Sequence, residues 1–390
     1  MTPSSDSQRT LRTRIAPRPR PLTPWHFTNP KHWTGDNVLQ FAEQGSQSLI
    51  DEVVLAGFRV VRTRRSEAYM RNILSDAHRA IAAYDEAGWL DNPRLAHADP
   101  EAPQDWTLRD DRAGKSNFLH LEFPTAYEPF DKDPSSARWN EFVENRTVHA
   151  WVLQHDEPRP WVVNVHGAGM GKPRMDLKLF RAEYLHHELG LNVIHPVLPL
   201  HGPRSPEGDS GNYPSESVMH NLHGALQSVN DVRRAVAWVR QQQPGQPIGM
   251  HGISMGGFTT ALVASLEPDL ACAILGVAPV DLVMLLEAHH GTGSGYDLRV
   301  QNFEAGARLS SMISPLKLDP AVPWEARFMY AGIVDRLVDY SDHVAPMIAH
   351  WDYPEVMVFD GGHVGIGLDR KVPGFIDTAL AKAGLTRAAA

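Results

Sequence analysis

The sequence has a single cysteine, Cys272, among its 390 residues. One thiol cannot form an internal disulfide, which excludes the disulfide framework that stabilises many small secreted domains. Long apolar runs are also missing, because the stretch from Leu270 to Val280 is about half the ~20 residues that a membrane-spanning helix needs. The N-terminal arm contains Arg, Pro and Ser but no apolar core of a signal peptide. We therefore expect a cytoplasmic protein without a transmembrane segment.

An excess of positive charge is absent as well. The 37 Lys and Arg residues are outnumbered by 46 Asp and Glu residues, which gives a formal net charge of -9. An acidic chain has no general attraction for nucleic acid or anionic lipid, so we expect no nucleic-acid partner. With 42% hydrophobic residues, the chain is long enough to bury one large core and to carry an accessory region.

The first 145 residues divide into two parts by composition. Residues 1–24 are rich in Pro, Ser and Arg, which predicts a disordered basic arm. Residues 25–145 follow a mainly helical pattern, which is clearest where apolar residues recur at helical spacing from Ser66 to Gly88. Ser66 is a candidate N-cap for this helix. A single apolar stripe predicts that the helix docks onto the rest of the protein.

From about residue 146, short β-rich runs alternate with helical segments. This alternation is typical of an α/β protein with a mostly parallel central sheet and helices on both faces, and we expect residues 146–390 to form one such domain. The expected strands are TVHAWVLQ, PWVVNVHG, LNVIHPVL, PIGMHGIS, ACAILGVAPV, ARFMYAGIVD and EVMVFDGG.

A glycine-rich stretch, VHGAGMGKP from Val165 to Pro173, overlaps the second of these runs. A P-loop needs Gly five positions before the Gly of its Gly-Lys pair and Ser or Thr after it, but these positions hold His166 and Pro173. The dinucleotide fingerprint also fails, since its third glycine would fall at Lys172. The spacing therefore argues against a nucleotide site.

A second glycine motif follows the fourth expected strand. Gly252-Ile253-Ser254-Met255-Gly256 fits the G-x-S-x-G nucleophile elbow, between a strand and a helix as that motif requires. Larger side chains two positions on either side of the serine would collide with the strand and the helix. We expect Ser254 to be a catalytic nucleophile; the alternative is an ordinary glycine-rich turn.

A serine hydroxyl needs a general base, and the base needs an acid that orients it. This elbow is followed along the chain by the acid and then by the histidine. His363, in the glycine-flanked loop FDGGHVGIG after the last expected strand, is the candidate base. Asp335, at the end of the strand before it, is the favoured acid, and Asp281 is the competing candidate.

Attack of a serine on a carbonyl creates an oxyanion that needs preorganised N–H donors. In this arrangement the donors are the N–H of the residue after the nucleophile and one from the loop after an earlier strand. The VHGAGMGKP stretch is that loop, so the backbone amides of Ala168 and Met255 are the candidate oxyanion hole. The glycine-rich loop would then stabilise the negatively charged oxygen of the reaction intermediate, and not a phosphate.

The segments HGAGMG, GISMGG, GIVD and GGH together resemble the serine α/β-hydrolase superfamily over about residues 146–390. Within it, GMHGISMGG followed by GGHVG is similar to a branch that includes the eighteenth human α/β-hydrolase-domain-containing protein. The resemblance implies the α/β-hydrolase fold and no cofactor. It implies catalytic roles for Ser254, Asp335 and His363.

Other residues are candidates for substrate contacts, metal ligands or a cap over the site. His201 and Arg204 lie in a long polar loop that could reach the substrate. The pairs His186-His187 and His289-His290 lack metal-ligand spacing, so we expect no metal. Residues 281–326 exceed a normal connection and predict an inserted cap-like segment.

The combination predicts a serine hydrolase that cleaves a carboxylic ester of a small or lipid-like acyl group through an acyl-enzyme. An acyltransferase would use the same residues with an alcohol in place of water, and a non-catalytic binding protein could keep the same fold. The sequence does not name the acyl or alcohol part of the substrate, nor the oligomeric state.

Overall fold

The computed structural model describes residue 51 and residues 66–206, 213–289, 296–367 and 369–386. The arm expected at residues 1–24 lies outside the described residues. Most of residues 25–65 and the glycine-rich stretch 291–295 also lie outside them.

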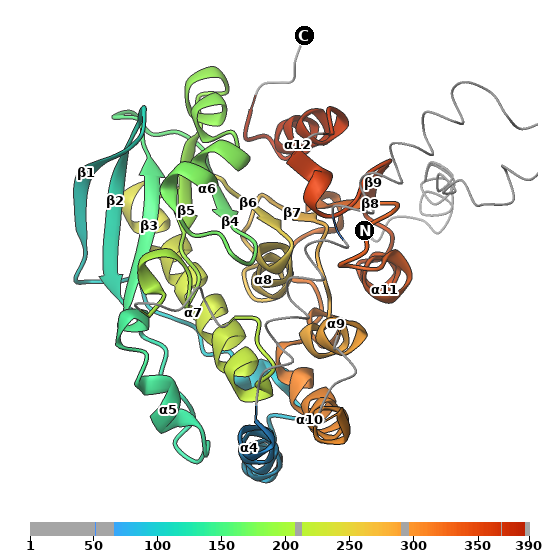
Figure 1. Ribbon diagram of the computed structural model, residues 1–390. Helices are drawn as coiled ribbons and strands as arrows, with labels where there is room; N and C mark the ends of the chain where they lie inside the picture. Colours follow the sequence, from blue (N-terminus) through green and yellow to red (C-terminus); the bar gives the residue numbers. More distant parts are fainter. Residues whose placement is uncertain (1–50, 52–65, 207–212, 290–295, 368, 387–390) are drawn as a thin grey trace, which may run out of the picture.

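The centre of the molecule is a nine-stranded sheet, counted over the described residues, with the order β1-β2-β3-β5-β4-β6-β7-β8-β9 (Figure 1). The pairs β1–β2, β2–β3 and β3–β5 are antiparallel, and the other pairs are parallel. The strands are β1 Thr107–Ala113, β2 Ser116–Pro124, β3 Thr147–Leu153, β4 Trp161–Val165, β5 Asn192–Pro196, β6 Ile248–Ile253, β7 Cys272–Gly276, β8 Arg327–Gly332 and β9 Glu355–Phe359.

The seven runs expected from the sequence all form strands, β3 to β9. Every residue of β4, β5, β6 and β7 is buried, as expected for parallel strands that helices cover on both faces. Residues that are neighbours along a strand point to opposite faces of the sheet and pack in different hydrophobic cores. Val163 packs in the cluster that includes α7 and α8, whereas Val162 packs in the cluster that includes α6 and α12.

Helices cover the sheet on its two faces. In Figure 1, α6 and α12 lie on one face, and α7, α8 and α11 lie on the other. The helices are α4 Glu67–Glu86, α5 Ser136–Asn140, α6 Pro173–Leu179, α7 Val218–Gln242, α8 Met255–Ala264, α9 Leu282–Ala288, α10 Tyr296–Leu309, α11 Ala345–His350 and α12 Lys371–Lys382. The mostly parallel sheet, covered on both sides, confirms the expected fold class.

The region expected to be mainly helical contains α4 but also two strands. Ser66 caps α4 as expected, because its hydroxyl accepts a hydrogen bond from the Tyr69 N–H at 3.2 Å. The strands β1 and β2 were not expected, because β1 reads TLRDDRA and has almost no apolar alternation. They extend the central sheet, which therefore continues across residue 145.

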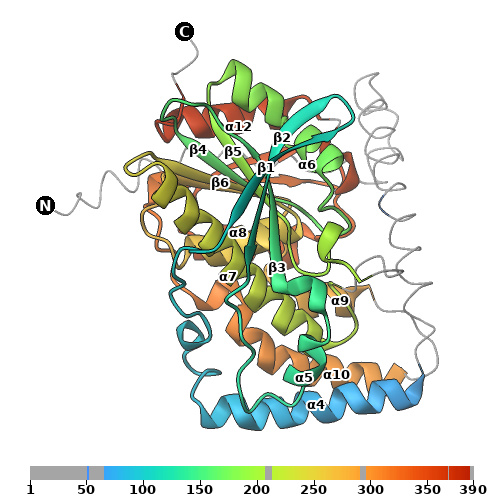
Figure 2. The ribbon, with the colours of Figure 1, turned by 90° about the vertical axis from the view of Figure 1, so that its left-hand side faces the viewer.

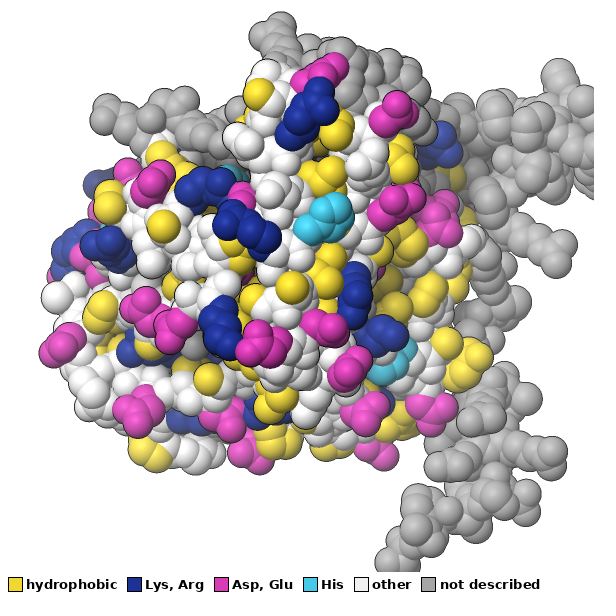
Figure 3. Space-filling view, turned by 90° about the horizontal axis from the view of Figure 1, so that it is seen from below, with side chains coloured by type: hydrophobic (Ala, Val, Ile, Leu, Met, Phe, Trp, Pro, Cys, Tyr) yellow, Lys and Arg dark blue, Asp and Glu magenta, His cyan; other side chains and the backbone are white. Residues whose placement is uncertain are grey.

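Helices α4 and α10 form an outer layer against α7 (Figure 2). The helix α10 belongs to the segment 281–326, which also contains α9. On the face seen from below the view of Figure 1, basic and acidic side chains are interspersed over the surface (Figure 3). Within the described part of the chain, no helix combines the length and the apolar character needed to cross a membrane.

Candidate active site

The elbow between β6 and α8 holds Ser254 in a strained backbone conformation, with φ 58° and ψ -121°. The flanking positions have no room for a side chain. A Cβ at Gly252 would lie 2.1 Å from the Gly256 carbonyl oxygen, and a Cβ at Gly256 would lie 1.9 Å from the Val165 carbonyl oxygen. The chain can therefore make this turn, close to the end of β4, only with glycine at both positions.

The structure brings Ser254, His363 and Asp335 together in one hydrogen-bonded chain. His363 Nε2 lies 2.8 Å from Ser254 Oγ, and His363 Nδ1 lies 2.7 Å from Asp335 Oδ2. Each residue stands directly after or near the end of a parallel strand: Ser254 after β6, Asp335 after β8 and His363 after β9. These strand ends meet at one edge of the sheet, which is where ligands of open α/β sheets bind.

Asp335, and not Asp281, is the carboxylate beside His363. The second oxygen of Asp335 accepts hydrogen bonds from the backbone N–H groups of Leu337 and Val338, at 2.9 and 2.8 Å. These bonds fix the carboxylate so that its other oxygen faces the imidazole. Asp281 instead caps α9, where its side chain accepts from the N–H groups of the first turn.

A fourth polar residue, Asp51, supports this arrangement and was not found from the sequence. Its carboxylate is fully buried. It accepts hydrogen bonds from the backbone N–H groups of His363, Val364 and Arg336, at 2.8, 3.0 and 3.0 Å. Asp51 thus joins the loop that carries His363 to the loop that carries Asp335. The only sequence signal is an acidic residue directly after the apolar pair Leu49-Ile50.

Two opposing effects set the pKa of His363. Burial, the larger single influence, disfavours the imidazolium and lowers the pKa. The carboxylates of Asp335 and Asp51, with the hydrogen bond from Asp335, act in the opposite direction. Together they outweigh burial, so the pKa of His363 lies above its ordinary value.

The glycine-rich loop after β4 passes directly over the elbow. A Cβ at Gly167 would lie 3.4 Å from Ser254 Cβ, so no side chain separates this backbone from the serine. His166 fixes the loop, because its Nδ1–H donates to the Gly167 carbonyl at 2.8 Å and its Nε2 accepts from the Leu198 N–H at 3.0 Å. Burial lowers the pKa of His166 to about 4, which keeps this imidazole neutral.

Ala168 and Met255 line the same pocket as Ser254. Met255 is the first residue of α8, and the first N–H groups of a helix have no partner within the helix. Gly169 and Gly171 have positive φ values of 76° and 88°, which let the loop turn sharply beside the pocket.

The pocket beside Ser254 is small and mainly apolar, with a volume of about 190 Å³. One wall is α9, from the segment that the sequence predicted to be a cap, and includes Leu282, Leu285 and Leu286. Residues from the loops after β7, β8 and β9 complete it, with Pro214 from the segment before α7. The lining residues are Ala168, Pro214, Ser254, Met255, Pro279, Leu282, Leu285, Leu286, His289, Leu337, Val338, His363 and Val364.

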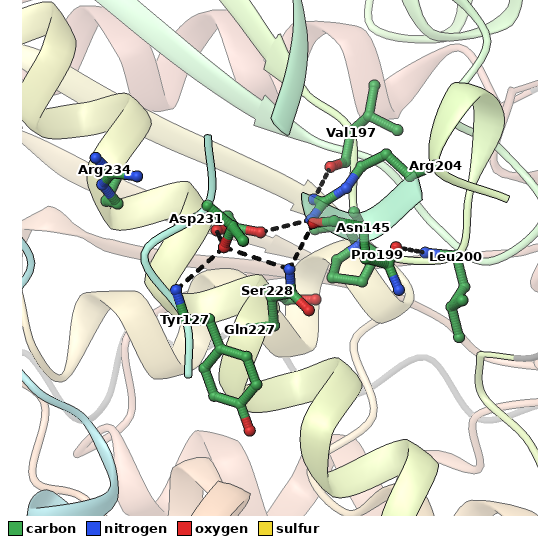
Figure 4. Close-up of polar contacts among 12 residues, drawn as sticks. Tyr127, Asn145, Val197, Pro199, Leu200, Arg204, Gln227, Ser228, Asp231 and Arg234 are labelled. Carbon is green, nitrogen blue, oxygen red and sulfur yellow. Dashed lines mark hydrogen bonds and ion pairs between the residues drawn. The ribbon is translucent and has the colours of Figure 1, made fainter. Parts of the chain in front are cut away.

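His201 and Arg204, the expected substrate contacts, do not line this pocket. Arg204 is fully buried and forms an ion pair with Asp231 at 2.8 Å (Figure 4). Its guanidinium also donates to the backbone carbonyls of Val197 and Asn145. His201 is buried, and its Nδ1–H donates to a nearby backbone carbonyl. The sequence placed both in a polar loop, but the loop folds inward at these positions.

One group of potential metal ligands occurs among the described residues, and it lies away from Ser254. His120, Glu122 and His149 on β2 and β3 have ligand atoms within 4.8 Å of one another. The sequence predicted no metal on the basis of the pairs His186-His187 and His289-His290, and this cluster is separate from both. His186 hydrogen-bonds to a backbone carbonyl, and His290 lies outside the described residues.

Comparisons with known proteins agree with this architecture. Residues 143–286 match a family model described as "Alpha/beta hydrolase domain containing 18". The chain is 40% identical over 341 residues to the uncharacterized protein MT2702 of Mycobacterium tuberculosis (strain CDC 1551 / Oshkosh), a match that covers 87% of this chain and 82% of that protein. The acetyl xylan esterase from Paenibacillus sp. R4 has a similar fold, with a TM-score of 0.52 and 15% identity, over 76% of this chain and 93% of that one. The chain therefore belongs to the same family as this mycobacterial protein, and it has the α/β-hydrolase fold, with the domain model matched over residues 143–286.

Proposed function

We propose that the protein is a serine hydrolase that cleaves carboxylic esters through an acyl-enzyme intermediate. The observation that carries the proposal is the hydrogen-bonded chain from Ser254 Oγ through His363 to Asp335, which opens into an apolar pocket. A strained serine at an elbow, an imidazole within hydrogen-bonding reach and a fixed carboxylate behind it are the groups that acyl transfer requires.

In the first half of the reaction, Ser254 Oγ attacks the ester carbonyl carbon and its proton passes to His363 Nε2. The imidazolium that forms is stabilised by Asp335 through the Nδ1–H hydrogen bond. When the tetrahedral intermediate collapses, the bond to the alcohol oxygen breaks and His363 returns the proton to that oxygen. A water then repeats the sequence on the acyl-enzyme and releases the acid.

The backbone N–H groups of Ala168 and Met255 are the proposed oxyanion hole. Both residues line the pocket together with Ser254, and attack by Ser254 places negative charge on the carbonyl oxygen of the substrate. Because the donors belong to a helix start and to a glycine-rich loop held by His166, they need little rearrangement when the charge develops.

The pocket favours a short to medium apolar acyl group. At about 190 Å³ it is smaller than the ~300–1,000 Å³ typical of sites for drug-sized ligands. Each buried methylene contributes up to ~0.8 kcal/mol, about fourfold in kcat/KM, until the pocket is full. Across p-nitrophenyl esters from acetate to decanoate, we expect kcat/KM to rise over the first few carbons and then fall. A steady rise to decanoate would exclude this closed pocket.

The test of the reaction itself is steady-state hydrolysis of p-nitrophenyl butyrate by matched variants. Ser254→Ala and His363→Ala each remove a member of one unit, so both should lower kcat by more than ~10⁴-fold. Ser265→Ala, which removes a hydroxyl bonded to a backbone carbonyl at the end of α8, is the control and should keep full activity. Retention of activity in Ser254→Ala would refute the proposal.

The same assay separates hydrolysis from acyl transfer when alcohol acceptors are added. A hydrolase releases mainly the free acid, whereas an acyltransferase would form mainly the new ester. Cys272 is no rival nucleophile, because it is fully buried and burial raises the pKa of its thiol to about 12.

A further inference from the structure

Three polar side chains converge on one face of the antiparallel part of the sheet. His120 and Glu122 are two residues apart on β2 and so face the same side, and Glu122 is paired directly with His149 on β3. His120 Nε2 lies 2.9 Å from His149 Nδ1 and 3.7 Å from Glu122 Oε1. His149 Nδ1 lies 3.1 Å from the same oxygen. The two ring nitrogens and the carboxylate oxygen are therefore close to one another and surround a common point.

The hydrogen bonds within the group leave this cluster incompletely satisfied. The guanidinium of Arg109 donates to Nδ1 of His120, so the ring proton of His120 is on Nε2 and is donated to His149 Nδ1. His149 Nδ1 then has no proton of its own to offer to Glu122 Oε1, although that oxygen is only 3.1 Å away. A single proton, on His120 Nε2, is therefore shared among three electron-rich atoms. A cation at the centre of the group could bind all three atoms at once.

The donor set suits a metal ion. His120 and His149 each offer a ring nitrogen and Glu122 offers a carboxylate oxygen, and these atoms lie within 4.8 Å of one another. Two imidazoles and one carboxylate are a common ligand set for zinc.

We propose that His120 Nε2, His149 Nδ1 and Glu122 Oε1 form a Zn²⁺ site. In a tetrahedral site with bonds of ~2.0–2.1 Å, neighbouring ligand atoms are about 3.3 Å apart. The separations of 2.9, 3.1 and 3.7 Å lie on both sides of that value, so small side-chain rotations would complete the geometry. The ligand side chains are 8%, 23% and 13% exposed for His120, Glu122 and His149, which leaves room for a water as fourth ligand.

Two residues on the neighbouring strand β1 supply the surroundings of the ion. Asp111 Oδ2 lies 3.4 Å from His120 Nδ1, where it can accept the ring proton that this nitrogen carries when Nε2 binds metal. Arg109 competes, because its guanidinium holds the same nitrogen and Glu122 in the absence of the ion. Its side chain is about half exposed, so it can turn toward solvent when the ion enters.

The site has a structural role and is separate from ester hydrolysis. In the sheet order, β3 is separated from β6, which leads to Ser254, by β5 and β4. Three strand spacings of ~4.8 Å place the two sites at least ~14 Å apart. Bound zinc would join β2 to β3 and fix the edge of the sheet. The inference does not depend on the proposed hydrolase activity.

The experiment uses the untagged full-length protein, dialysed against a chelator and titrated with Zn²⁺ by calorimetry near pH 7.5. We expect one equivalent to bind. His149→Ala and the isosteric Glu122→Gln should weaken binding by at least ~100-fold, beyond the ~10–100-fold cost of losing an outer partner. His187→Ala, which removes an exposed histidine outside the cluster, should bind like the wild type. Circular dichroism of each variant reports that it is folded.

Two further measurements separate a zinc site from a purely structural hydrogen-bond cluster. Arg109→Gln should tighten zinc binding, because it removes the competing cation, whereas Asp111→Asn should weaken it. Co²⁺ bound in place of Zn²⁺ should give visible absorption bands of a low-coordinate site, which His149→Ala abolishes. The proposal is overturned if the wild type takes up no Zn²⁺ at ~1 mM, or if His149→Ala takes up as much as the wild type.

Discussion

His363 is held by two carboxylates, Asp335 at its ring and Asp51 at its backbone N–H. Only the neutral imidazole can accept the proton of Ser254, so activity is present above the pKa of His363 and is lost as the pH falls through it. Because that pKa is raised, the rising limb of kcat/KM against pH should have its midpoint above ~6.5. A profile that is flat between pH 5 and 8 would contradict a histidine base.

Asp51→Asn tests the second carboxylate. Asparagine keeps one oxygen for the N–H groups but removes the charge, so the midpoint of the pH profile should move to lower pH. Loss of charge-assisted hydrogen bonds worth ~1.5–3 kcal/mol should also lower kcat/KM by about 10- to 100-fold. The control is Asp339→Asn, an exposed carboxylate that caps the segment Tyr340–Val344 and should leave the midpoint unchanged. If the midpoint of the pH profile did not shift in Asp51→Asn, the charge of Asp51 would have no effect on His363 and Asp51 would have only a packing role.

At this scale, a candidate residue can be found from the sequence where it stands in a local pattern. Ser254 is placed by the glycines on either side of it, and His363 by the glycine-flanked loop after the last strand. Asp51 has no such pattern, and its three hydrogen-bond partners lie 285, 312 and 313 residues away along the chain. Arg204 was misplaced because a charged residue in a polar loop is usually exposed, whereas here Asp231 compensates its burial.

The elbow between β6 and α8 depends on the close approach of α8 to the end of β4. In Gly256→Ala the new methyl group would lie 1.9 Å from the Val165 carbonyl oxygen, and backbone atoms would have to move. We expect a loss of at least ~2–3 kcal/mol in the free energy of unfolding. Gly374→Ala in α12 is the matched control, because nothing lies within 4 Å of the added carbon.

The control should be stabilised by ~0.5–1 kcal/mol, the usual gain from alanine over glycine inside a helix. Chemical denaturation of both variants measures the difference. Equal stability of Gly256→Ala and the wild type would show that the elbow is less tightly packed than these distances imply.

At the scale of elements, buried strands were predictable and polar edge strands were not. The strands β4 to β7 are buried throughout and mainly apolar because both of their faces are covered, and that pattern is visible in the sequence. The edge strand β1 is half-buried at most, so it carries no such signal. The cluster of His120, Glu122 and His149 was missed for a related reason, since it exists only in the pairing register of β2 with β3.

For the whole molecule, Arg204 joins three separate parts of the chain around one buried charge. Its partners lie before β3, after β5 and in α7 (Figure 4). Arg204→Met leaves Asp231 buried without its cation, and we expect a loss of ~3–5 kcal/mol in stability. The order of preference among p-nitrophenyl esters should not change, because Arg204 does not line the pocket. A changed preference with unchanged stability would restore Arg204 as a substrate contact.

The outer layer of α4 and α10 shows what the sequence leaves open at this scale. The periodic apolar stripe of α4 predicted a docked helix but not its partner. The structure docks it against α10, where Asp85 of α4 pairs with Arg308 at 2.8 Å. Nearby, His97 bonds the Met312 carbonyl at 2.9 Å. Contacts between segments more than 200 residues apart leave no local pattern that could reveal them.

The most direct test of the central claim is to identify the residue that reacts with a fluorophosphonate probe, by peptide mass mapping of the full-length protein. The phosphorus atom of the probe takes the place of the ester carbonyl carbon, so only an activated serine is labelled. Our account predicts one phosphonylated residue, Ser254, with labelling that follows the neutral form of His363 and vanishes in His363→Ala. Failure to label Ser254 in active protein, or labelling at a different residue, would contradict it.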